Sequence, residues 1–151
     1  MPESKEHSVQ VLEIQKEERI DAPIDIVFQA VLDELGPESR MMDDKPFPMK
    51  LEAWPGGRWY RDLGNNAGHF WGHVQVIKPP AVLEITGPMP MSYAAVNHIQ
   101  YRLAAKGSGT LLTFTHQSMG VIAPEHRDGM PEGWAFKLTR MRQIAEARAK
   151  K

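Results

Sequence analysis

The sequence predicts an α+β fold in which a curled antiparallel sheet of about seven strands packs against a long C-terminal helix. Apolar residues recur at helical spacing in two stretches, one near the N-terminus and one at the C-terminus. Between them the apolar period shortens to that of strands, and turns rich in glycine and proline separate the strand segments. Because such short turns join neighbouring antiparallel strands, the order indicates one sheet with helices on one face.

The first elements are predicted in chain order. The segment Val9–Arg19 places apolar residues among charged ones and predicts a half-exposed strand. Asp21-Ala22-Pro23 supplies an N-cap candidate and a proline suited to a first helical turn. The apolar positions of Ile24–Leu35 then form one helical stripe, which Gly36-Pro37 ends. A short helical turn and an irregular connection are expected before the second strand.

The remaining elements follow the change of period. The last helix is predicted from Trp134 to Lys150, directly after Gly133, with its apolar residues on one face. The six further predicted strands are Lys50–Trp54, Arg58–Leu63, Phe70–Ile77, Val82–Thr86, Asn97–Leu103 and Thr110–His116.

Composition limits the class of protein. The chain has 151 residues, a net charge of −1 and no cysteine, so we expect a flexible tail over residues 1–8 and one domain over residues 9–151. The lack of cysteine excludes disulfides, thiolate metal ligands and a thiol nucleophile. The balanced charge indicates neither nucleic acid nor an anionic membrane as partner, and no apolar run predicts a membrane span or a signal peptide. We therefore expect a cytoplasmic monomer or homodimer without a cofactor.

The hairpin made by the last two strands allows a prediction of register. Opposed residues in an antiparallel pair share a face. The pairs expected across the glycine-rich turn are Leu103–Thr110, Tyr101–Leu112, Ile99–Phe114 and Asn97–His116. This face is apolar with a polar end, so we expect it to lie beneath the long helix.

His116 is the candidate for chemistry at that polar end. A histidine titrates near neutrality, so His116 is either a polar anchor or proton-transfer group, or a hydrogen-bonded structural residue, and the sequence leaves both open. His69 and His73 have a spacing that binds metals on a helix. In a strand the same spacing spans about 13 Å, so no metal site is expected.

A helix lying across a curled sheet can enclose an apolar cavity with few polar groups. Trp59 and Trp134 are expected as its walls, and the methionines of the two long connections as its rim because thioethers adapt to varied shapes. The candidate ligand-binding residues are Trp59, Asn97, Ile99, Tyr101, Leu112, Phe114, His116, Trp134, Leu138, Met141, Met42 and Met91.

Several short motifs together resemble a known superfamily. They are Ile20-Asp21-Ala22-Pro23 followed by Val27-Phe28, Pro55-Gly56-Gly57-Arg58-Trp59, the run from Gly72 to Pro80, Gly109-Thr110-Leu111-Leu112-Thr113, and Gly133-Trp134. In this order and spacing the sequence resembles the START-like, helix-grip (SRPBCC) superfamily, and within it the homologues of heat-shock-protein ATPase activators. The resemblance implies a helix-grip fold. Members variously bind lipids and other apolar molecules, cyclise polyketides or assist a chaperone, so it implies the fold more strongly than the function.

Three functions follow as hypotheses. The first is binding of a small apolar or amphipathic ligand between sheet and C-terminal helix, without covalent chemistry. The second is a cyclase-like or hydrolase-like enzyme with His116 as acid and base and Asn97 or Tyr101 orienting the substrate. The third is a module that interacts with a chaperone, as the resemblance implies. No nucleophile elbow, phosphate-binding loop or dinucleotide fingerprint is present in the sequence.

Overall fold

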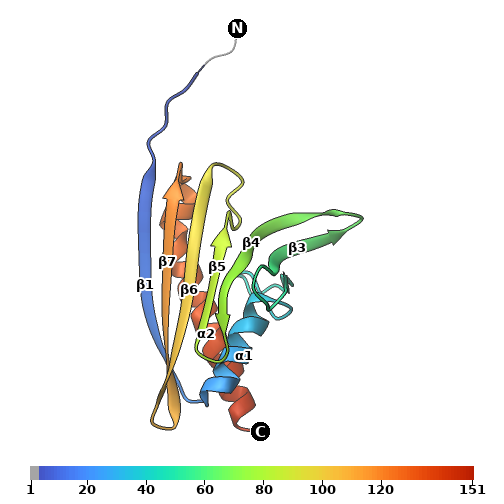
Figure 1. Cartoon of the computed structure of the whole chain (residues 1–151), viewed down its shortest axis with the longest axis vertical. Coiled ribbons are helices and arrows are strands. Elements are labelled where there is room, and N and C mark those ends of the chain that lie inside the picture. Colours follow the sequence, from blue (N-terminus) through green and yellow to red (C-terminus); the bar gives the residue numbers. More distant parts are fainter. Residues whose placement is uncertain (1–3) are drawn as a thin grey trace.

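The computed structural model describes residues 4–151 and has seven strands and two helices (Figure 1). In chain order they are β1 (Gln10–Ile20), α1 (Ile24–Leu35), β2 (Lys50–Leu51), β3 (Arg58–Gly64), β4 (Ala67–Lys78), β5 (Val82–Gly87), β6 (Ala95–Lys106), β7 (Gly109–Gly120) and α2 (Pro124–Ala149). Residues 36–38 form a turn directly after α1. Of the predicted N-terminal tail, residues 1–3 lie outside the described residues. Residues 4–9 are exposed and have no regular structure.

All strands join one antiparallel sheet in the order β1-β7-β6-β5-β4-β3-β2. Only β1 and β7 are neighbours in the sheet without being neighbours in sequence, so the first strand pairs with the last. Both helices lie on one face of the sheet, and the β3–β4 hairpin leans away from the other strands (Figure 1). The predicted α+β helix-grip arrangement is confirmed.

The β6–β7 hairpin has a different register from the one that we predicted. The observed pairs are Leu103–Leu112, Tyr101–Phe114, Ile99–His116 and Asn97–Ser118. The strands continue to Lys106 and Gly109, so only two residues form the turn, and Gly107 takes a φ of 61° there. This tighter turn moves the register by two residues. Because the side-chain period of a strand is also two, every residue keeps its predicted face.

The last helix begins at Pro124, ten residues before the predicted start at Trp134. Gly129, Pro131 and Gly133 all lie inside the helix, and these residue types disfavour helix in sequence-based analysis. Proline in the first turn fits a helix start, and contacts with the core stabilise a segment of poor intrinsic propensity. The predicted inner face is present, with Trp134, Leu138, Met141 and Ala145 buried.

Several strands also differ in length from the prediction, among them β2 and β4. The strand at Lys50 ends after two residues, because Glu52 turns to accept hydrogen bonds from the backbone and the side chain of Arg58. Strand β4 begins at Ala67, before the predicted Phe70. Asn65 and Asn66 both have positive φ and form the tight turn that lets β3 and β4 pair to their ends.

Within residues 4–151, no helix is both long and apolar enough to cross a membrane.

Candidate functional site

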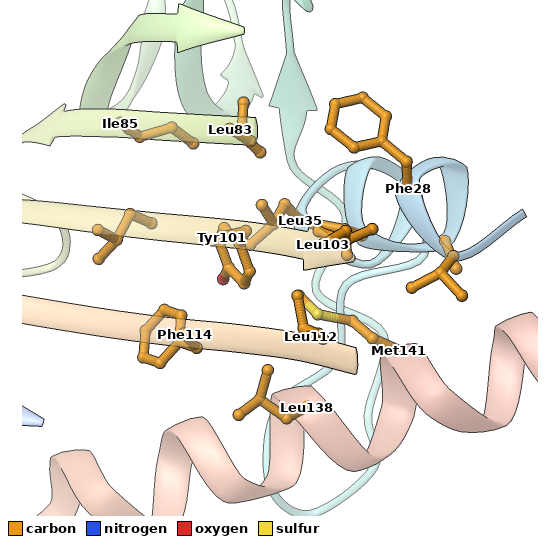
Figure 2. Close-up of a cluster of buried hydrophobic side chains, with 14 of the residues drawn as sticks. Phe28, Leu35, Leu83, Ile85, Tyr101, Leu103, Leu112, Phe114, Leu138 and Met141 are labelled. Carbon is orange, nitrogen blue, oxygen red and sulfur yellow. The ribbon is translucent and has the colours of Figure 1, made fainter. Parts of the chain in front are cut away.

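The candidate site is the interior between the sheet and the two helices. Figure 2 shows side chains from β5, β6 and β7 pointing toward α1 and α2, with Leu138 and Met141 reaching up from α2. The structure buries Trp59, Met91, Asn97, Ile99, Tyr101, Leu112, Phe114, His116, Trp134, Leu138 and Met141, which are eleven of the twelve candidate residues. Met42 is the exception, because its side chain is 56% exposed in the connection after α1.

A row of aromatic rings crosses this interior. The ring centroids of Tyr101 and Phe114 are 5.0 Å apart, and those of Phe114 and Trp134 are 4.4 Å apart, both in tilted arrangements. Aromatic rings in such close, tilted contact stabilise the interior beyond the area that they bury. The row therefore links β6, β7 and α2 through direct contacts.

His116 is held from both sides. The indole Nε1 of Trp134 donates to Nδ1 of His116 at 2.8 Å, so this ring nitrogen carries a lone pair. The proton is then on Nε2, which donates to Oδ1 of Asn97 at 2.7 Å. Burial lowers the pKa of His116 to about 4, so the ring is neutral at pH 7. Of the two interpretations of His116 left open by the sequence, this geometry supports the structural one.

Asn97 extends the network to the connection between β5 and β6. Its Nδ2 donates to the carbonyl oxygens of Gly87 and Pro88, both at 3.2 Å, and lies 3.4 Å from the sulfur of Met91. The chain of hydrogen bonds thus runs from α2 across two strands to the connecting loop. Met91 is buried as part of this network.

The hydroxyl of Tyr101 is different, because it is fully buried and has no hydrogen-bond partner. Its burial, and to a lesser extent the charge of Glu34, raise its pKa well above the usual value. Most buried polar groups in proteins have a partner, either in the protein or in ordered water. We predicted Tyr101 as a lining residue from its face, but the unpartnered hydroxyl depends on tertiary packing that the sequence pattern does not contain.

A second buried polar group, the carboxyl group of Glu34 on α1, was not predicted from the sequence. Lys137 Nζ lies 3.2 Å from Oε1, and Arg140 Nε donates to Oε2 at 3.2 Å. Burial nevertheless raises the pKa of Glu34, because desolvation outweighs the two cations. A signal was present, since Glu34 continues the apolar stripe of Val27 and Val31 at helical spacing.

The surface of residues 4–151 includes three hollows that bear on the site. One of about 560 Å³ is on the outer face of the sheet, where exposed Val11, Val96 and Met119 occupy neighbouring positions of β1, β6 and β7. Another of about 570 Å³ follows the β3–β4 hairpin, and a third of about 270 Å³ lies along β1. Asn97 is the one candidate ligand-binding residue that lines any of these three hollows.

A curled antiparallel sheet that holds a long C-terminal helix over an apolar interior defines a protein of the helix-grip, SRPBCC type. Residues 21–146 match the model of the family described as Activator of Hsp90 ATPase homolog 1-like protein, and the chain belongs to this family. No curated protein matches the sequence.

Solved structures agree with this fold. An uncharacterised protein from Rhizobium leguminosarum superimposes with a TM-score of 0.75 at 17% identity, covering 95% of this chain and 99% of the other. A protein from Rhizobium loti gives a TM-score of 0.70 at 22% identity, with 91% and 99% covered. CalU16 from Micromonospora echinospora gives 0.60 at 22% identity, with 98% and 95% covered. At these identities the likeness concerns the fold alone.

Proposed function

We propose that the protein binds a small apolar or amphipathic molecule between the sheet and α2. The observation that carries this proposal is the Tyr101 hydroxyl, which is buried among apolar side chains and has no partner. An unpaired buried hydroxyl costs about 1–3 kcal/mol, so a bound molecule that satisfies it recovers free energy. Membership of a family that often binds hydrophobic ligands supports the same function.

The proposed ligand occupies space that side chains of α2 fill in its absence. Met141 and Leu138 face the aromatic row from α2, and both are buried. Met has three rotatable bonds and a polarisable sulfur, so Met141 can move aside at a lower cost than a branched side chain. Entry of a ligand then requires a small displacement of α2 from the sheet.

The acid–base alternative has less support, because protein groups occupy both ring nitrogens of His116. The chaperone-interacting alternative stays a prediction that rests on the family resemblance. A cytoplasmic location and a monomeric or homodimeric state also stay predictions.

Methyl NMR with 2-ethylnaphthalene as the probe tests the proposed site. We expect dose-dependent shifts at the methyl groups of Leu112, Leu138 and Met141, which line the interior, while Val11 and Met119 on the outer face serve as internal controls. Shifts confined to the outer-face methyl groups, or no shifts up to the solubility limit of the probe, would contradict the proposal. Native mass spectrometry of freshly purified protein, followed by organic extraction, then identifies any natural ligand.

A further inference from the structure

We infer that the outer face of the sheet docks a basic, amphipathic segment of a protein partner. The surface concerned lies over β1, β7, β6 and β5 and combines a row of exposed apolar side chains with two carboxylates. Both helices lie on the opposite face of the sheet (Figure 1). The inference is therefore independent of the ligand proposed for the interior.

Three apolar side chains form the centre of this outer-face surface. Met119 on β7 pairs with Val11 on β1 and with Val96 on β6, so the three side chains form a row across the strands. Val11 is 74% exposed, Met119 50% and Val96 42%. Neighbouring strands are about 4.8 Å apart, so the row extends over about 10 Å. Exposed apolar side chains that gather in one place and have polar neighbours are typical of surfaces that bind proteins.

The hollow of about 560 Å³ follows this row and adds polar side chains to the surface. It includes the next row along the strands, in which Gln117 pairs with Glu13 on one side and with His98 on the other. Thr86 continues this polar row on β5. Within residues 4–151, only residues of β1, β5, β6 and β7 line the hollow. The surface is thus a hollow with an apolar half and a polar half, and neither helix covers it.

The charged side chains of this surface are acidic. The carboxylate of exposed Glu13 accepts a hydrogen bond from the amide of Gln117 at 3.2 Å, and that of Glu84 bonds His98 at 2.8 Å. Within residues 4–151, neither carboxylate forms an ion pair with Lys or Arg. Arg102 lies outside the hollow, about 13 Å along β6 from His98. Both carboxylates can therefore pair with cations of a partner.

Apolar centre and acidic margin together select the chemistry of the partner. Carboxylates without a cationic neighbour attract Lys and Arg and repel anions, so nucleic acid and acidic peptides are disfavoured. A second copy of this chain is also disfavoured. A two-fold interface places the same surface on both sides, so it brings the carboxylates of Glu13 and Glu84 toward those of the other copy. The occupant that fits is a segment with apolar side chains on one face and Lys or Arg beside them.

Methyl NMR of the full chain tests the inference with a basic amphipathic helix as the probe. The probe is a peptide of about 14 residues that contains only Leu and Lys, with Leu at helical spacing, and a second peptide has Glu in place of each Lys. We expect the basic peptide to shift the methyl signals of Val11, Val96 and Met119, while those of Leu112 and Leu138 in the interior stay unchanged. The acidic peptide should leave all these signals unchanged. Added salt should weaken binding of the basic peptide.

Two variants separate the apolar and the charged contributions. Met119→Lys removes the central apolar side chain and adds a charge that repels the basic peptide, so Kd should rise at least about tenfold. Leu63→Lys is its matched control, because Leu63 is 64% exposed near the end of β3, outside this surface, and should leave Kd unchanged. Glu13→Gln should raise Kd about threefold, as expected for the loss of an exposed ion pair. Glu132→Gln, at an exposed position of α2, should not change it.

Three results would overturn the inference. The first is the absence of shifts at the outer-face methyl groups with the basic peptide, or equal binding of the acidic one. The second is an unchanged Kd in Met119→Lys. The third is a dimer of the unmodified protein in sedimentation velocity that Met119→Lys abolishes, because this result assigns the surface to a second copy. Each of these results leaves the proposed binding in the interior unaffected.

Discussion

Trp134 on α2 donates its indole N–H to Nδ1 of His116 on β7, and the two nitrogen atoms are 2.8 Å apart. This hydrogen bond joins the long helix to the sheet in the middle of the buried interior. It also determines the tautomer of His116, because the accepting nitrogen cannot carry the proton. The remaining N–H of the ring is thereby directed to Asn97.

Trp134→Phe should lower the free energy of unfolding by about 2 kcal/mol, because it leaves Nδ1 of His116 buried without a donor and removes part of a buried ring. Urea denaturation at pH 7 measures the effect. Trp54→Phe is the matched control, since Trp54 is 57% exposed and should change stability by less than about 0.5 kcal/mol. Equal effects of the two substitutions would mean that the buried hydrogen bond is unimportant.

Acid should destabilise the fold through His116. Its pKa falls from 6.5 to about 4 on folding, so the unfolded chain binds a proton more readily than the native protein does. The stability due to neutral His116 is fully present above pH 6.5 and is lost as the pH falls to about 4, by about 3 kcal/mol. In His116→Gln the loss between pH 7 and pH 4.5 should be smaller. Ring NMR signals of His116 that titrate near pH 6.5 would refute the assignment.

Tyr101→Phe should leave the stability of the ligand-free protein unchanged or raise it by about 1 kcal/mol, because the hydroxyl that it removes has no partner. Tyr93→Phe should have the opposite effect. The Tyr93 hydroxyl accepts from the backbone of Ala123 and bonds His126 at 2.7 Å, so its loss should cost about 1 kcal/mol. Thermal unfolding of the two variants side by side checks the difference. A large destabilisation by Tyr101→Phe would reveal a partner for its hydroxyl.

Glu34→Gln should destabilise the protein by about 3 kcal/mol, because it leaves Lys137 and Arg140 partly buried without their counter-ion. Asp62→Asn is the control on the surface, where the pair with Lys50 is exposed to solvent and should contribute little to stability. Denaturant unfolding at pH 7 compares them. If the two losses are equal, the cluster between α1 and α2 does not stabilise the fold.

Gly87→Ala should disrupt the sheet, because an added Cβ would meet the backbone of Trp71 and Gly72 at 2.4 Å. A loss of at least about 2 kcal/mol is expected from this overlap. Gly133→Ala should instead stabilise the protein by up to about 1 kcal/mol, since its Cβ meets nothing within 4 Å in the middle of α2. A melting temperature of Gly87→Ala that is unchanged or raised would argue against the close packing of β4 and β5.

The interior lining was predictable because it depends on local periodicity. Residues that alternate along a strand keep their face even when the register shifts, as Tyr101 and Phe114 show. The start of α2 was not predictable in the same way, because Pro131 and the glycines on either side of it have low helix propensity. The helix forms there because contacts with the core stabilise it. Met42 was placed at the rim by composition alone, and composition carries no information on which way a loop residue faces.

The sequence by itself therefore determined the order and type of the elements, and which apolar residues of the β6–β7 hairpin and of the last helix face the interior, since both follow from spacing along the chain. Only the tertiary structure decided that Trp134 and Asn97 hold His116 neutral and that Glu34 pairs with Lys137. It also decided that the hydroxyl of Tyr101 has no partner. These properties depend on contacts between residues far apart in sequence and on burial, and both exist only after the sheet and the two helices have packed together.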